Sequence, residues 1–186
     1  MPPQLAPTVW RTCRVIACGT RLRLLQRIAA DGPACVTALA RRCRLSRFVA
    51  TQSLRALQAR GLLRATRTSR WVVYDLQTDP AVRHAADVQQ AVLAAFRRGE
   101  THADIRRAAT AFTHERRLLL VRALAAGPST APALARRCAM SPNALYRHAA
   151  KLERRGLLRR SDGDTLRLTS PAGGIVRDLL RIALRD

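Results

Sequence analysis

The stretch Ala38-Leu39-Ala40-Arg41-Arg42-Cys43 decides the fold class of this sequence, because it recurs letter for letter at residues 133–138. Other blocks recur at the same offset of 95 residues: Gly32-Pro33 at 127–128, Ser46 at 141, Leu57 at 152 and Arg60-Gly61-Leu62-Leu63-Arg64 at 155–159. Residues 20–75 and 115–170 share 20 identical positions without a gap. A fixed offset across separate blocks predicts two tandem units of one fold, because a solenoid would need more stacked repeats.

Each copy has the pattern of three helices followed by a β-hairpin. The predicted elements of the first copy are helices over 20–30, 36–43 and 47–60 and strands over 62–65 and 70–76. Gly32-Pro33 ends the first helix, Ser46 is a natural N-cap of the third, and Gly61 follows its end. In the second copy, strands over 157–160 and 166–168 flank an Asp162-Gly163 turn. This order predicts a mainly α fold with small β-hairpin wings, the winged helix-turn-helix.

Flanking helices extend the predicted repeat to nearly the whole chain. They are expected over 9–17, over 80–98 after Asp79-Pro80, within 103–112, and over 171–185 after Ser170-Pro171. We therefore predict two winged helix-turn-helix domains, over 1–98 and 99–186. Their flanking helices are expected to pack centrally as an intramolecular pseudo-dimer. Eight leucines are assigned to the core: Leu24, Leu25, Leu54, Leu57, Leu119, Leu120, Leu145 and Leu152.

The charge balance points to a polyanionic partner. The chain has 34 basic and 12 acidic residues, a formal net charge of +22, and Lys151 is its single lysine. An arginine- and alanine-rich composition is typical of GC-rich bacterial genomes, which explains arginine in place of lysine but leaves the surplus unexplained. A surplus of this size favours nucleic acid as the partner of this basic protein. Aromatic residues make up only 4%, which disfavours base stacking on single strands.

Several other protein classes are disfavoured. Hydrophobic residues at 48% exclude wholesale disorder, and no apolar run is long enough to predict a transmembrane helix. Arginines interrupt the N-terminal region, so no signal peptide is expected. The five cysteines are odd in number and include no CxxC, which favours buried thiols and a cytoplasmic location. Because no phosphate loop, HExxH or GxSxG motif is present, no enzyme activity is expected.

The residues resemble the ArsR family of winged-helix transcriptional regulators. The resemblance lies in Thr20-Arg21-Leu22-Arg23-Leu24-Leu25, in residues 54–63 and in Arg70-Trp71-Val72-Val73-Tyr74-Asp75-Leu76. In the second copy, Tyr146-Arg147-His148 and residues 152–157 are similar to the MarR family. The resemblance implies double-stranded DNA as the partner. It also implies a dimer built from the flanking helices, here within one chain.

The resemblance does not extend to the metal sensor of the ArsR family. Arsenic-sensing members carry Cys-x-Cys on the short second helix, where this chain has Cys35 alone in the first copy and no cysteine at 130–132. A lone thiolate cannot hold a soft metal, so neither a metal nor another cofactor is expected. Cys43 and Cys138 occupy equivalent positions, which suggests a shared packing role. The four histidines are interpreted as surface or DNA-facing residues: His84, His102, His114 and His148.

The third helix of each copy is the expected recognition helix, which enters the major groove. The first copy offers Arg47, Phe48, Thr51, Gln52 and Arg55 to the bases, and the second offers Asn143, Tyr146, Arg147 and Lys151. Candidates for phosphate or minor-groove contacts are Arg67, Arg70, Arg160 and Arg167. The reading surfaces differ, so two non-identical half-sites are expected. Two alternatives stay open: a further homodimer, and a winged-helix module for protein interaction or RNA binding.

Overall fold

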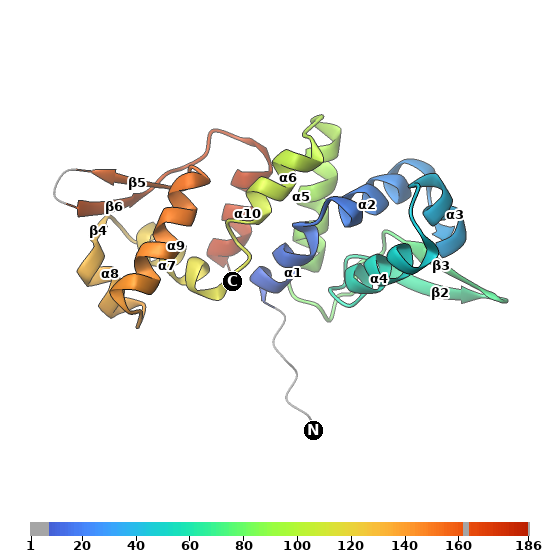
Figure 1. Ribbon diagram of the computed structural model, residues 1–186, viewed down its shortest axis with the longest axis horizontal. Coiled ribbons are helices and arrows are strands. Elements are labelled where there is room, and N and C mark those ends of the chain that lie inside the picture. Colours follow the sequence, from blue (N-terminus) through green and yellow to red (C-terminus); the bar gives the residue numbers. More distant parts are fainter. Residues whose placement is uncertain (1–7, 162–163, 186) are drawn as a thin grey trace, which may run out of the picture.

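The computed structural model describes residues 8–161 and 164–185. It is mainly helical, elongated, and has a small sheet toward each end (Figure 1). The first half contains α1 (Val9–Ile16), α2 (Gly19–Asp31), β1 (Ala34–Cys35), α3 (Val36–Arg42), α4 (Arg47–Gln58), β2 (Arg64–Thr68), β3 (Trp71–Asp75) and α5 (Ala85–Arg97). The second half contains α6 (His102–Ala109), α7 (Glu115–Ala125), β4 (Ser129–Thr130), α8 (Ala131–Arg137), α9 (Pro142–Arg154), β5 (Leu158–Ser161), β6 (Thr165–Leu168) and α10 (Gly174–Arg185).

The order helix, strand, helix, helix, strand, strand occurs in both halves and is compatible with a winged helix-turn-helix. Both sheets are antiparallel, with strand orders β1-β3-β2 and β4-β6-β5. The expected two-stranded hairpins therefore each gain a third strand, which sequence patterning missed. The missed strands are two residues long, which is too short for an alternating pattern to reveal them. They are defined by their strand pairing, such as that of Ala34 with Tyr74. The predicted Asp162-Gly163 turn lies outside the described residues.

The turn before α4 and the turn before α9 have the same backbone geometry. Arg44 and Ala139, 95 residues apart, both adopt a left-handed conformation, with φ of 50° and 48°. In each unit the Ser N-cap hydroxyl accepts a hydrogen bond from the backbone N–H three residues later: Ser46 from Val49 and Ser141 from Ala144. The predicted N-caps are confirmed. Such caps satisfy N–H groups that a helix start leaves free.

Two flanking helices begin later than their proline signals predicted. Helix α5 begins at Ala85, five residues after Pro80, and in the turns that precede it Val82 lies against Gly61. A Cβ on Gly61, whose φ is +66°, would lie 2.8 Å from the Cβ of Val82. Helix α10 begins at Gly174, three residues after Pro171. There the Ile175 N–H donates to the Glu100 carboxylate at 3.1 Å, so a residue from a distant segment caps the helix.

The four flanking helices meet between the two units. Helix α10 packs against α5 and α6, and α1 packs against α5 and α6 (Figure 1). An ion pair of 3.0 Å between Arg98 and Asp178 adds to the contact between the end of α5 and α10. The buried apolar side chains of both units form one continuous cluster that runs through this centre. Burial of this cluster is the main favourable term that holds the two units together.

The two units are not buried equally. Leu24 in α2 is fully buried, but Leu119 at the equivalent position in α7 is 39% exposed, so its assignment to the core was wrong. Helix α2 is covered by α1, α5 and α6, whereas α7 packs mainly on α10 and α9. In the described residues, no contact of similar extent joins α1 to α7. The position equivalent to Leu24 therefore stays open to solvent.

Candidate nucleic-acid interface

Helix α4 presents a polar and aromatic face to solvent. Its apolar residues Ala50, Leu54 and Leu57 are buried in the core, at the spacing of one helix side. The opposite side exposes four of the predicted DNA-contacting residues: Arg47, Phe48, Gln52 and Arg55. Phe48 is 71% exposed, which is unusual for a large apolar side chain. The α4 face carries hydrogen-bond donors, an amide and an apolar ring, the groups that read base edges.

Helix α9 also has one exposed and one buried side, but the exposed residue types differ from those of α4. Asn143, Tyr146 and Arg147 are exposed, while Ala144, Leu145, Ala149 and Leu152 are buried. The Arg160 guanidinium lies 5.6 Å from the centre of the Tyr146 ring, which is itself 62% exposed. Arg160 also forms ion pairs of 3.0 Å with both Glu153 and Asp164. Its charge is therefore balanced inside the protein, and its contact to Tyr146 orients the ring.

The wing strands bring the remaining predicted arginines to the surface. Arg67, Arg70 and Arg167 are all exposed. The Arg67 Nε donates to the Ser69 carbonyl at 3.4 Å, and the Arg70 guanidinium lies 5.2 Å from the Trp71 ring centre. These contacts are local to the hairpin and involve no acidic partner. The first wing thus carries cations that are free to meet a phosphate.

Two predicted residues are less available than expected. Thr51 is half-buried, and its hydroxyl donates to the Arg47 carbonyl at 2.7 Å within the helix. Lys151 is half-buried as well, and burial together with Arg155, Arg154 and Arg117 lowers the pKa of its amine. The Thr51 hydroxyl is therefore already engaged, whereas the Lys151 amine lies among cations.

Three of the histidines are not surface residues, contrary to expectation. The His84 side chain is only 7% exposed, and its Nδ1 lies 3.7 Å from the Asp87 carboxylate. His102 packs edge-on to Phe96 with ring centres 5.8 Å apart. His148 of α9 is half-buried, with its ring centre 4.4 Å from that of His114. His114 is exposed, and its Nδ1 caps α7 by accepting from the Arg116 N–H. Long-range packing, which spacing does not reveal, produces these contacts.

The contact between His114 and His148 predicts a loss of stability in mild acid. Burial, His114 and nearby arginines lower the pKa of His148 from 6.5 to about 4. Because the unfolded chain takes up the proton first, the free energy of unfolding should fall from about pH 6.5 toward about pH 4, and be unaffected above that range. Urea unfolding at a series of pH values measures this slope. His148→Gln should have a shallower slope than the unmodified protein, and an equal slope would contradict the assignment.

Two of the cysteines have thiols that ionise less readily than usual. All five are free thiols. Burial raises the pKa of Cys43 and that of Cys138, which disfavours the reactive thiolate at both equivalent positions. Over residues 8–161 and 164–185, no three His, Cys, Asp or Glu side chains gather where they could hold a metal ion. No helix in the same ranges has the length and apolarity needed to cross a bilayer.

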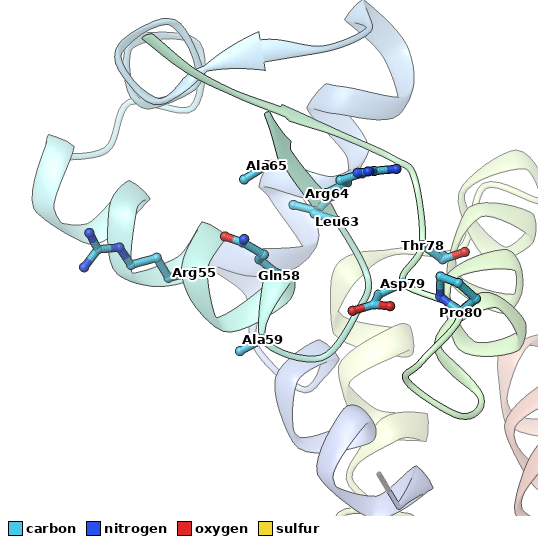
Figure 2. Close-up of a pocket in the computed structure, with 9 residues that line it drawn as sticks. All are labelled: Arg55, Gln58, Ala59, Leu63, Arg64, Ala65, Thr78, Asp79 and Pro80. Atoms are coloured by element: carbon cyan, nitrogen blue, oxygen red, sulfur yellow. The ribbon is translucent and has the colours of Figure 1, made fainter. Parts of the chain in front are cut away.

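A cleft of about 610 Å³ lies beside the end of α4, between that helix and the segment after β3. Figure 2 shows that the Arg55 and Arg64 side chains point in opposite directions away from it. Arg64 donates to the Gln77 side chain at 3.4 Å. The polar groups of the cleft do not converge on a common point, so it lacks the arrangement of a small-molecule site.

Sequence reasoning also overlooked a group of arginines outside the recognition helices and wings. Arg11 and Arg14 lie on α1, and after the larger effect of burial both lower the pKa of Arg60, two residues beyond α4. The one available signal was the distribution of acidic residues. Residues 1–74 contain 14 arginines but a single acidic residue, Asp31.

Residues 112–161 match a protein family described as "Helix-turn-helix domain". No curated protein matches the chain. The matched segment runs from the end of α6 through α7, α8 and α9 to β5, so it includes the helix whose exposed face was described above. In residues 112–161 the chain is therefore similar to a helix-turn-helix domain.

Proposed function

We propose that this protein is a transcriptional regulator that binds double-stranded DNA in a sequence-specific manner, without catalysis. The observation that carries the proposal is the composition of the two exposed helix faces. The α4 face and the α9 face combine arginine, amide and aromatic side chains. Helix α4 contains no acidic residue, and the one on α9, Glu153, is paired with Arg160. A helix-turn-helix inserts this second helix into the major groove, where such side chains distinguish base pairs.

We further propose that the chain is a duplicated protomer that acts as its own dimer. The equivalent core residues stayed similar, while the exposed ones diverged. Arg47-Phe48 is aligned with Pro142-Asn143, and Thr51-Gln52 with Tyr146-Arg147. Two-fold symmetry in a protein is mirrored in its operator, so unlike helices should select unlike half-sites. The preferred site should therefore be asymmetric, with half-site centres about one helical turn, or roughly 10 bp, apart.

Selection of bound duplexes from a random pool tests this proposal directly. An asymmetric site bound by one chain is the expected result. A perfect palindrome, or two chains on a minimal site, would contradict the pseudo-dimer and favour a further homodimer. Equal affinity for unrelated duplexes would contradict sequence-specific binding. Preference for RNA in a competition assay would favour the RNA-binding alternative.

Substitutions in helices and wing should have different consequences for binding. Arg47→Ala and Arg147→Ala should each relax base preference at one position of the site, at a cost of about 1–3 kcal/mol, because each removes a base-edge contact. Arg67→Ala and Arg70→Ala should weaken binding to all sequences alike, because they remove phosphate contacts. Affinities for a set of single-base variants of the selected site measure both effects. If Arg147→Ala lowers all affinities equally, α9 does not read bases.

A further inference from the structure

We propose that Arg11 and Arg14 of α1, here called the α1 arginine pair, bind the phosphate backbone of the DNA segment between the two half-sites. This inference rests on the proposed DNA-binding function and adds a third contact region to the two recognition helices. Neither residue belongs to a recognition helix or a wing. Their contribution would therefore be to affinity and to the spacing between half-sites, and not to the reading of bases.

The α1 arginine pair is held in place by one aromatic ring. The guanidinium carbons of Arg11 and Arg14 lie 5.1 Å and 5.7 Å from the centre of the Trp10 ring. Trp10 is half-buried and packs against the central core, so the platform is fixed. The opposite side of α1 buries Val9, Cys13 and Ile16. Two cations stacked on a fixed ring lose less side-chain freedom on binding an anion than two mobile ones.

No acidic group balances this charge in the described part of the chain. Neither Arg11 nor Arg14 forms an ion pair or a side-chain hydrogen bond with residues 8–161 or 164–185. The first acidic residue of the sequence is Asp31. Burial, Arg11 and Arg14 all lower the pKa of Arg60, which follows the end of α4. Such mutual repulsion destabilises the free protein and is relieved when an anion binds.

The α1 arginine pair lies between the two recognition helices. Helix α1 packs against α4 on one side and against α6 on the other (Figure 1). Burial, Arg117 and Arg116 lower the pKa of His114 against the opposing effect of Glu115, and Arg14 lowers it slightly further. His114 in turn contacts His148 of α9. Helix α1 therefore lies between the half of the chain that contains α4 and the half that contains α9.

The groove between α5 and α10 is different, because acidic residues balance its arginines. It is lined by Asp87 and Asp178 together with Arg97, Arg98 and Arg181, and Arg98 pairs with Asp178. Both the α1 surface and the α5–α10 groove contain arginines. They differ because acidic residues lie beside the arginines only in the groove. A duplex held by α4 and α9 at a spacing of about one helical turn must place backbone phosphates between them. In this proposal, those phosphates meet the α1 arginine pair.

A double variant of the α1 pair, compared with a matched control, tests the proposal. Arg11→Gln/Arg14→Gln removes two charges from α1, and Arg97→Gln/Arg181→Gln removes two charges from the α5–α10 groove. The probe is a duplex selected from the random pool, and affinity is measured over a range of salt concentrations. The α1 variant should bind about tenfold more weakly or worse near 0.15 M salt, with a log–log salt slope shallower by about 2. Its base preference should be unchanged, and the control should keep the slope of the unmodified protein.

Two further measurements separate binding from folding. Arg11→Lys/Arg14→Lys should retain the salt slope, because lysine keeps the charge. The thermal midpoint of the glutamine variant should not fall, since like charges are removed. The inference is overturned if the glutamine variant keeps the original slope, or if the control loses as much affinity. In those cases duplex binding by the unmodified protein would still support the proposed function. Absence of any duplex binding by the unmodified protein would overturn both.

Discussion

Raising the salt concentration from about 50 mM to about 200 mM is expected to weaken binding to duplex DNA by about a thousandfold or more. The chain has a formal charge of +22, and part of it lies on the recognition helices, the wings and α1. Neutralising six or more phosphates releases their counterions, which gives a log–log slope of about −5 or steeper. The large effect follows from the number of unbalanced arginines and not from any single contact.

Affinity for one duplex, measured at a series of salt concentrations, determines this slope. The structure also identifies an arginine that should contribute little to it. Arg160→Gln should leave the slope nearly unchanged, because Glu153 and Asp164 already balance its charge. Arg67→Gln removes an exposed cation without an acidic partner and should make the salt slope shallower by about 0.9. A slope near zero for the unmodified protein would mean that its charge serves another partner.

Arg117→Ala is expected to lower the free energy of unfolding by about 3 kcal/mol, a large share of a typical domain's stability. Arg117 is 9% exposed, and its guanidinium joins the start of α7 to the segment after α6. Its Nε donates to the Ala111 carbonyl at 2.8 Å, and its Nη2 donates to the Thr110 carbonyl at 3.1 Å and the Thr113 hydroxyl at 2.6 Å. Removal leaves buried acceptors without donors and creates a cavity.

Denaturant unfolding at constant pH measures the effect, and Arg116→Ala provides the control. Arg116 is adjacent and exposed, so its loss should change stability by less than about 0.5 kcal/mol. Arg117→Leu adds a sharper comparison, because leucine fills the space but cannot donate. If Arg117→Leu is as stable as the unmodified protein, then apolar packing and not hydrogen bonding is what this position contributes.

Features that depend on neighbours in the sequence were predictable. Apolar residues at helical spacing located the first recognition helix within two residues of its observed ends, and the residue type and position of Ser46 and its repeat partner Ser141 indicated the caps. The exposed faces of α4 and α9 followed from the same periodicity. These features depend on backbone hydrogen bonds and side chains within one or two turns, so the local sequence contains the required information.

The candidate interface was only partly predictable. Exposure of Arg47, Phe48 and Tyr146 followed from helix periodicity. The contact of Arg160 with Tyr146, Glu153 and Asp164 could not be derived, because it joins two helical positions to the hairpin. The sequence places Arg11 and Arg14 on a helix, but only the tertiary structure places that helix between the two units. The partner of a long, flexible side chain depends on which elements come together, and spacing along the chain does not contain that information.

The sequence by itself determined the repeated order of elements, the caps and the polar faces, because each results from interactions over a few residues. Only the tertiary structure decided how equivalent positions are used. Leu22 and Arg117 are equivalent in the repeat and both are buried, one by apolar packing and the other by three hydrogen bonds. Leu24 is buried and Leu119 is exposed, because α6 covers α2, whereas in the described residues the equivalent helix α1 makes no comparable contact with α7. Burial is a property of the neighbours that folding brings together, so identical residues in a repeat can have different environments.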